Sequence, residues 1–214
     1  MSFMTMLSRK FELPSPSEAL PGRLEPAVPS EKHAFLDRPL AEPVPAGGNW
    51  VVLGMGSFWA AEPLFWGLPG VLMTAAGFSG GHTPNPTYNE VGTGRTGHAE
   101  VVRVIYDPAR LSLRAILKIF WEKHNPTQGM RQGNDVGTQF RSVIHVADEA
   151  GVAVAEETRQ AYQDALIQAG IKSTITTVIA ARDDFYFAND YHQQYALRNG
   201  GTGKILKGVG VLFE

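Results

Sequence analysis

The sequence predicts an α+β fold, a two-layer sandwich arranged as a ferredoxin-like plait with an irregular N-terminal arm and a C-terminal tail. Apolar strand-like runs and amphipathic helical segments are mixed along residues 49–199, without the strict alternation of a doubly wound sheet. Eight of the 14 prolines lie in residues 1–48. A chain of 214 residues is long enough for one well-buried domain and short for two.

The proline-rich segment 1–48 is predicted to be an arm that wraps the domain. Proline fixes φ and lacks a backbone N–H, so a segment this rich in proline cannot hold a long helix or a central strand. The domain itself is expected at residues 49–199. Residues 200–214 are expected to form a glycine-containing tail.

The elements of the domain follow from the spacing of its apolar residues. Strands are predicted where short apolar runs are bounded by glycine or polar residues, at 49–55, 71–78, 98–106, 139–146 and 174–180. Helices are predicted at 57–66, 111–124 and 148–169. Ser112 can cap the second helix, and Pro63 should kink the first helix or delay its start. The polar segments 82–91 and 125–137 are expected to be loops.

Composition argues against several classes of function. The formal net charge is −2 and the Lys and Arg residues are scattered, which disfavours nucleic acid as a partner. No apolar stretch reaches the length of a signal peptide or a membrane span, so we expect a cytoplasmic protein without a membrane partner. The absence of cysteine excludes disulfides, thiolate metal sites and a cysteine nucleophile.

Two familiar binding patterns fit the sequence poorly. Residues 92–97 (GTGRTG) match the dinucleotide pattern GxGxxG, but a polar loop precedes them and a strand-like run follows. The candidate metal ligands are His98, Glu100, Asp135 and His192. They lack the short fixed spacings of a metal motif, so no metal is expected.

Residues 56–59 place a polar side chain at a predicted helix start beside two large rings. The helix N-terminus would favour an anion at Ser57, while Phe58 and Trp59 offer an apolar slot. A hydrolase nucleophile is disfavoured, since the glycines of a nucleophile elbow are missing. Helix capping by Ser57 and core packing of the two rings are the alternatives, and residue types alone favour them.

Glu100 lies near the start of a predicted strand. By strand alternation its side chain points to the same side as Val102, Val104 and Tyr106. A carboxyl group on this apolar face would be desolvated, which raises its pKa and suits it to act as a general acid. A solvated strand-end glutamate is an equally supported alternative. The polar loop 129–142 carries many donors and acceptors of the kind that line sites.

Several long segments resemble the type A peptide methionine sulfoxide reductase family. They are GSFWAAEPLFWGLPGV, GFSGGHTPNPTYNEV, GHAEVVRVIYDP, QGMRQGNDVGTQFRS and DYHQQY, in the family's order, and SEALPGR resembles the arm of bacterial members. The resemblance spans about residues 14–199 and implies the α+β plait. It also implies an oxidoreductase that repairs oxidised protein by reducing methionine-S-sulfoxide, free or in peptides.

The resemblance implies roles for individual residues. In the family a cysteine thiolate attacks the sulfoxide sulfur, and Ser57 stands at that position. The substrate methyl group would lie against Phe58 and Trp59, and Glu100 would protonate the oxygen with help from tyrosines. The remaining substrate-binding positions are Tyr88, Asp135 and Phe140. Resolving cysteines and thioredoxin then reduce the resulting sulfenic acid, and no cofactor is implied.

Three departures from the family pattern bear on activity. Serine has no accessible sulfenic-like state and cannot supply two electrons, so a chain with Ser57 should bind the sulfoxide without turnover. Phe140 lacks the hydroxyl of the usual tyrosine, and residues 199–214 contain no resolving cysteine. Ser57 fits either a reductase altered to trap its substrate or a natural relative. Such a relative would bind methionine sulfoxide or a similar group, or catalyse a different reaction.

Overall fold

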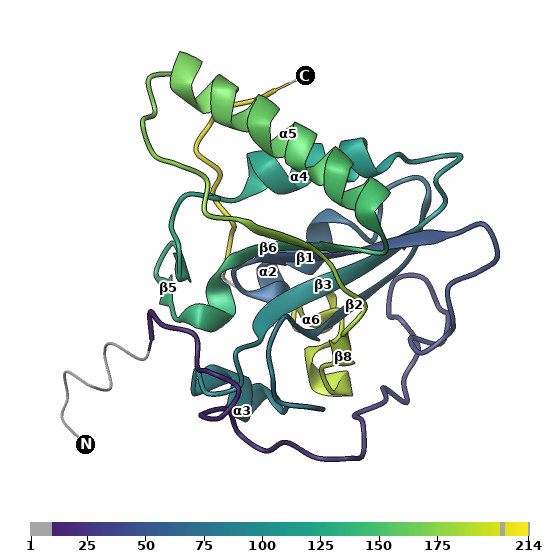
Figure 1. The fold of residues 1–214 in the computed structure, drawn as a ribbon. Coiled ribbons are helices and arrows are strands. Elements are labelled where there is room, and N and C mark those ends of the chain that lie inside the picture. The colour runs from purple at the N-terminus through teal and green to yellow at the C-terminus, as the bar shows by residue number, and fades with distance from the viewer. Residues whose placement is uncertain (1–9, 202–203, 214) are drawn as a thin grey trace.

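The computed structural model describes residues 10–201 and 204–213 and is built on a six-stranded sheet of order β7-β6-β1-β3-β2-β8 (Figure 1). Its strands are β1 Asn49–Met55, β2 Val71–Ser79, β3 Ala99–Tyr106, β6 Ser142–Val146, β7 Val178–Ala181 and β8 Tyr186–Phe187. A separate ribbon pairs β4 Arg131–Gln132 with β5 Asp135–Val136.

Helices connect most of these strands. The α-helices are α2 Phe58–Ala61, α3 Tyr88–Gly92, α4 Leu113–Lys123, α5 Glu149–Gln168 and α6 Tyr195–Arg198. The 3-10 helices are η1 Glu62–Leu64, η2 Thr138–Phe140 and η3 Asp190–His192. Of the helices in the described ranges, none combines the length and the apolar character that crossing a membrane requires.

The strand order confirms the predicted plait. Strands β6, β1, β3 and β2 are neighbours and all three pairings are antiparallel. Helix α2 lies between β1 and β2 in the chain, and α4 lies between β3 and β6, which is the ferredoxin-like βαββαβ order. Helix α5 then crosses over to β7, which pairs with β6 in parallel, and β8 extends the opposite edge.

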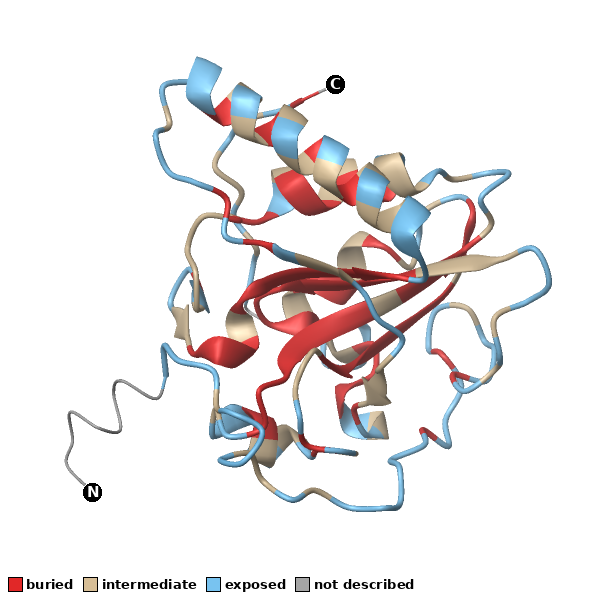
Figure 2. Cartoon of the chain, viewed as in Figure 1, coloured by how far each residue is buried: buried red, intermediate tan, exposed pale blue. Residues whose placement is uncertain are grey.

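The two faces of the sheet are covered differently. One face packs against α2, α4 and α5 in the main core, where Leu53, Val104 and Tyr162 are buried. The other face is covered by residues of the N-terminal arm, among them Leu40, and by Phe185 and its neighbours. Figure 1 shows the arm running around the side of the sheet away from α4 and α5, and Figure 2 shows the central strands almost wholly buried.

Three predicted elements differ from the structure. The helix expected at 57–66 ends after Ala61 and tightens into the 3-10 turn η1, since Pro63 cannot donate the backbone hydrogen bond of an α-helix. The strand expected at 139–146 begins at residue 142, after the turn η2. The strand expected at 174–180 begins at residue 178, because Thr176 bonds to the carbonyl of Pro126 instead of a neighbouring strand.

A short helix lies where a loop was predicted. Helix α3 begins after Thr87, whose side chain accepts a hydrogen bond from the backbone of Glu90, while the Glu90 carboxylate accepts one from the Thr87 N–H. This reciprocal capping box satisfies two backbone donors that a helix start leaves open. The spacing Thr87-x-x-Glu90 could have identified the helix from the sequence, but the surrounding prolines and asparagines concealed it.

The arm should contribute to stability through its apolar anchor. Leu40 is fully buried against Met73, Ala75 and Ile105 of the sheet, so Leu40→Ala should lower the free energy of unfolding by about 2–5 kcal/mol. Leu24→Ala, at a 96% exposed position of the same arm, should change it by less than about 0.5 kcal/mol. Urea unfolding followed by circular dichroism measures both, and equal effects would show that the arm does not act as packed core.

Candidate active site

A tight turn brings Ser57 to the end of the central strand. Strand β1 ends at Met55, and Gly56 then adopts φ 94°, a left-handed conformation that glycine tolerates. A Cβ atom on Gly56 would lie 2.7 Å from the Cβ of Gln132, so a larger residue would displace that side chain. Ser57 follows with extended backbone and only 3% exposure. Its side chain makes no capping hydrogen bond, so the capping role considered for it is not realised.

The carboxyl group of Glu100 meets the backbone directly after Ser57. Its Oε2 atom accepts a hydrogen bond of 3.2 Å from the Phe58 N–H. Glu100 is 3% exposed, and Val102 and Val104 from the same side of β3 belong to the helix-covered core, as strand alternation predicted. Burial raises the pKa of Glu100 to about 8, although the Phe58 N–H and the Lys204 charge oppose the rise. Near pH 7 this acid therefore holds its proton.

The start of helix α2 does not offer a free anion site at position 57. The helix has only four residues, and its first N–H, that of Phe58, is engaged by Glu100. The N–H expected to favour an anion at Ser57 therefore binds the side chain of Glu100. The helix start fixes the carboxyl group of Glu100 beside residue 57.

Four rings from three segments stack into a continuous surface, here called the aromatic wall: Trp59, Tyr88, His192 and Tyr195. Trp59 stacks on Tyr195 with centroids 4.1 Å apart, and Tyr88 stacks on His192 at 4.3 Å. The Trp59 Nε1–H donates a 3.2 Å hydrogen bond to His192 Nδ1. Burial lowers the pKa of His192 to about 4, so its ring is neutral and can accept this bond. Together these contacts hold Trp59 in one orientation.

Phe58 lies behind the aromatic wall. Its side chain is fully buried in the main core, 6.0 Å from the ring of Tyr88 and 5.6 Å from that of His192. Trp59, in contrast, is only partly buried. The two rings that the sequence singled out thus occupy different layers. Phe58 supports the wall from the core side, and Trp59 forms part of its outer surface.

Tyr88 reaches the same region from helix α3. Burial raises its pKa to about 12, and the charges of Glu100 and Asp135 raise it further in the same direction. Its hydroxyl group therefore stays protonated at physiological pH and can donate a hydrogen bond.

Asp135 and Phe140 meet the C-terminal tail. Both carboxylate oxygens of Asp135 lie 2.8 Å from the Lys204 Nζ atom. The same ammonium group lies 5.8 Å from the centroid of the Phe140 ring, within range of a cation–π contact. Lys204 is therefore a further charged group at this site, and it also lowers the pKa of Glu100.

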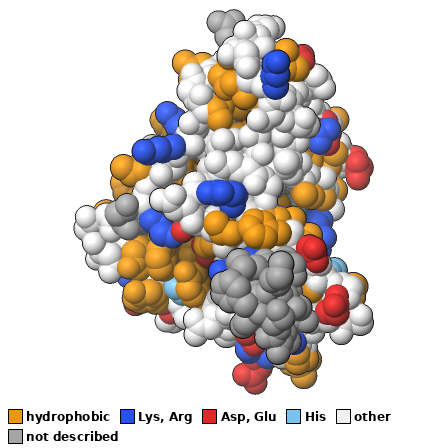
Figure 3. Space-filling view, turned by 90° about the vertical axis from the view of Figure 1, so that its left-hand side faces the viewer, with side chains coloured by type: hydrophobic (Ala, Val, Ile, Leu, Met, Phe, Trp, Pro, Cys, Tyr) orange, Lys and Arg blue, Asp and Glu red, His pale blue; other side chains and the backbone are white. Residues whose placement is uncertain are grey.

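A cavity of about 770 Å³ opens beside Ser57. It lies between the 125–135 loop and the tail, and its described lining includes Ser57, Gln132, Asp135 and residues 204–208. None of the four rings of the aromatic wall is part of that described lining. On the face shown in Figure 3, hydrophobic side chains gather in several patches with basic and acidic side chains between them.

The structure thus brings most of the predicted site residues together, and it adds His192, Tyr195 and Lys204. The sequence analysis named His192 as a candidate metal ligand and quoted the segment DYHQQY (190–195) without a role for its rings, although the aromatic-rich stretch 185–195 was an available signal. Within residues 10–201 and 204–213, no group of three or more His, Asp or Glu side chains is arranged to hold a metal ion. The site combines a neutral acid, aromatic surfaces and residue 57.

The raised pKa of Glu100 should be visible in stability. Its folded pKa of about 8 lies above the ordinary value of 4.5, so between these pH values the folded state binds more protons and loses stability as the pH rises. Glu100→Gln removes this loss. The unfolding free energy of the variant, relative to that of the unaltered chain, should therefore increase from pH 4.5 to pH 8. Urea unfolding across that range measures the gain. The exposed control Glu157→Gln on α5 should show no such divergence, and parallel curves for Glu100→Gln would contradict the burial argument.

Comparison with known sequences identifies relatives over almost the whole chain. The family profile described as peptide methionine sulfoxide reductase matches residues 49–207. Peptide methionine sulfoxide reductase MsrA of Brucella anthropi is 53% identical over 211 residues, which covers 99% of this chain and 96% of that protein. The protein of the same name from Brucella ovis is 51% identical with the same coverage.

Solved structures agree with the sequence comparison. Methionine sulfoxide reductase A of Corynebacterium diphtheriae superposes with a TM-score of 0.81 at 41% identity, over 88% of this chain and 92% of that chain. Mxr1 from Saccharomyces cerevisiae in its reduced form has a TM-score of 0.70 at 28% identity, over 81% and 96% of the two chains. With its plait, its buried acid and these relatives, the chain belongs to the peptide methionine sulfoxide reductase family.

Proposed function

We propose that this chain binds methionine-S-sulfoxide between the aromatic wall and Glu100, and that Ser57 prevents its reduction. The observation that carries the proposal is the contact between a buried, proton-bearing Glu100 and the backbone N–H that follows residue 57. A sulfoxide oxygen is a strong hydrogen-bond acceptor, and a neutral carboxylic acid beside an apolar surface suits it. The family membership supports this class of substrate.

The methyl group and the oxygen of the sulfoxide require different surroundings. The methyl group of methionine sulfoxide is apolar and would lie against Trp59, with Phe58 behind it in the core. The oxygen would face Glu100, with the protonated hydroxyl of Tyr88 as a second donor. Asp135 would help to hold the substrate once Lys204 gives way or shares its charge. The S epimer directs methyl and oxygen to these two sides.

Reduction requires a thiol at position 57. A cysteine thiolate would attack the sulfoxide sulfur, Glu100 would give its proton to the oxygen, and that oxygen would end on the cysteine as sulfenic acid. Methionine gains two electrons and the cysteine loses them. Two further thiols, from thioredoxin or dithiothreitol, then return the sulfenic acid to thiol, form one disulfide and release water.

Serine at position 57 leaves the binding groups in place and removes the electron donor. The hydroxyl of Ser57 has a far higher pKa than a thiol and forms no sulfenic-like state. The complete absence of cysteine also leaves no second thiol to take over. This favours sulfoxide binding as the activity of the chain in its present form, whether Ser57 is a substitution or a natural divergence.

Restoring the thiol should restore reduction. Ser57→Cys is expected to reduce a methionine-S-sulfoxide peptide with dithiothreitol, because the acid and the aromatic wall are already in place. The product methionine is measured by chromatography under excess reductant. Ser112→Cys, which puts a thiol at the exposed N-cap of α4, should give no turnover above background. A folded Ser57→Cys protein without turnover would count decisively against a reductase site.

Binding by the unaltered chain can be measured separately. Calorimetry should detect binding of the S epimer and much weaker binding of the R epimer, since only the S epimer directs its oxygen to Glu100. Trp59→Ala should weaken binding at least about tenfold, roughly 1.4 kcal/mol, whereas Trp50→Ala, which lies against the other face of the sheet, should not. Equal binding of both epimers would remove the proposed orientation.

A further inference from the structure

Glu62 is a fully enclosed acid that the site described above does not use. It lies in η1 and is 1% exposed. Its Oε1 atom accepts hydrogen bonds from Thr74 Oγ1 at 2.9 Å and from Gln194 Nε2 at 2.8 Å. Its Oε2 atom accepts one from the Gln194 backbone N–H at 2.9 Å. Two of these three bonds therefore go to a single residue near the C-terminus.

Gln194 has an unusual backbone conformation at the base of the aromatic wall. Its φ of 47° and ψ of 40° are left-handed, a region that costs a residue with a side chain on the order of 1 kcal/mol or more unless its surroundings hold it. It separates η3, which ends at His192, from α6, which begins at Tyr195. This one turn therefore sets how the rings of His192 and Tyr195 lie relative to each other.

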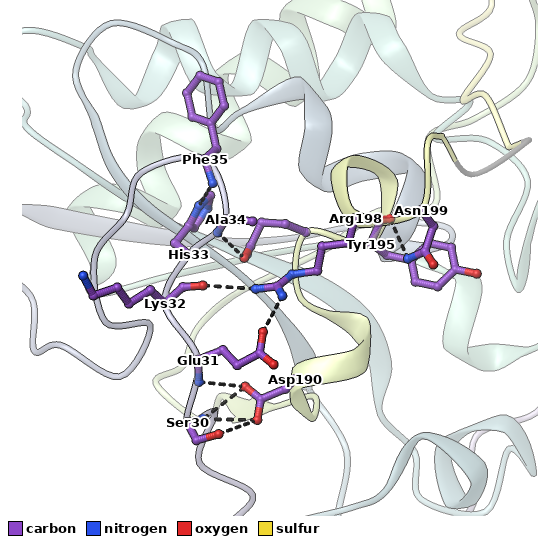
Figure 4. A network of polar contacts seen from close by, with 11 residues as sticks. Ser30, Glu31, Lys32, His33, Ala34, Phe35, Asp190, Tyr195, Arg198 and Asn199 are labelled. Carbon is purple, nitrogen blue, oxygen red and sulfur yellow. Dashed lines mark hydrogen bonds and ion pairs between the residues drawn. The ribbon is translucent and has the colours of Figure 1, made fainter.

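The N-terminal arm holds the same segment from its other side. Gln194 Oε1 accepts a hydrogen bond from the Ala34 N–H at 3.2 Å, and the carboxylate of Asp190 accepts bonds from Ser30 and Glu31. Arg198 reaches back to the Glu31 carboxylate. Figure 4 shows these contacts from residues 30–34 to the segment 190–198. The segment 190–198, which carries His192 and Tyr195, is thus held along its length by the arm. Glu62 adds a buried acid to these contacts.

A chain of hydrogen bonds leads from His33 through Thr74 to Glu62, and each group donates toward Glu62. His33 Nδ1 accepts bonds from the Phe35 and Leu36 N–H groups, so its Nε2 carries the hydrogen and donates to Thr74 Oγ1 at 2.8 Å. The Thr74 hydroxyl then donates to Glu62. Burial lowers the pKa of His33 to about 4, which keeps the ring neutral as this arrangement requires. Every donor around Glu62 consequently points toward its carboxylate.

We propose that Glu62 is a positioning residue of the site: by accepting both Gln194 donors it fixes the left-handed turn that holds His192 and Tyr195 against Trp59. The effect on substrate rests on the proposed function, whereas the effect on the rings does not. An amide in place of the carboxylate would turn one donor toward the donors of Gln194 and leave a buried hydrogen bond unmade. The turn, and with it the two rings, would then shift.

The Trp59 indole reports the ring positions directly. Its Nε1–H bonds to His192, so Glu62→Gln should shift the indole resonance of Trp59 in a ¹⁵N–¹H spectrum. The Trp121 indole donates to Thr158 between α4 and α5 and should keep its resonance. Trp59→Phe assigns the peak among the four tryptophans. General destabilisation would not select one indole, so an unmoved Trp59 peak in folded Glu62→Gln overturns the proposal.

Two further variants control this experiment. Glu122→Gln changes another largely buried acid, on α4, and should leave the Trp59 resonance in place. Gln194→Asn keeps a residue that tolerates the left-handed conformation but is too short to keep its amide contact with Glu62, so it should shift the Trp59 peak as Glu62→Gln does. If Glu62→Gln does not fold, Gln194→Asn decides the question by the same resonance.

The consequence for substrate is read in the Ser57→Cys background. Adding Glu62→Gln should raise KM about tenfold with kcat within about twofold, since the methyl surface is disturbed and Glu100 is not. A shifted Trp59 peak with unchanged KM would overturn the role in substrate binding. If Ser57→Cys itself is inactive, the proposed function fails, and the positioning of the rings by Glu62 is still decided by the Trp59 resonance.

Discussion

The hydrogen bond from the Phe58 N–H to Glu100 is the contact on which the site depends, because it joins the ends of the two central strands. The register of β1 and β3 pairs Leu53 with Val102, so Glu100 lies two residues further on, beside the turn that leads to Ser57. The pairing of β1 with β3 thus places Glu100 beside Ser57 without a long loop. Sites built on strands in this way are held more closely than sites on loops.

Two buried acids near this contact, Glu100 and Glu62, have different roles. Burial raises the pKa of both Glu100 and Glu62, to about 8 and about 7, but their hydrogen-bond partners differ in number. Glu100 has the Phe58 N–H as its partner and keeps a proton that it can give away. Glu62 accepts three hydrogen bonds, all from groups of the protein. Similar desolvation therefore serves a reactive group in one case and a structural group in the other.

Local patterns predicted the plait, because apolar spacing is a property of neighbouring residues. Strand alternation gave the side of the sheet to which Glu100 points, but it left a buried and a solvated carboxyl group equally supported. The short helix α3 was missed although its capping box is local. The aromatic wall could not be found in this way, since Trp59 and Tyr195 are 136 positions apart and meet only through the fold. The same holds for Glu62 and Gln194, whose partnership gives no periodic signal in the sequence.

The tail lysine gives the cleft a dependence on ionic strength. Lys204 and Asp135 are 38% and 30% exposed, and ion pairs of this kind contribute at most about 1 kcal/mol and weaken as salt screens them. Dilute buffer should therefore strengthen the contact of Lys204 with Asp135 beside the cavity, and concentrated salt should weaken it. Entry of a charged solute into this cavity would then follow the surrounding electrolyte more closely than entry of a neutral one.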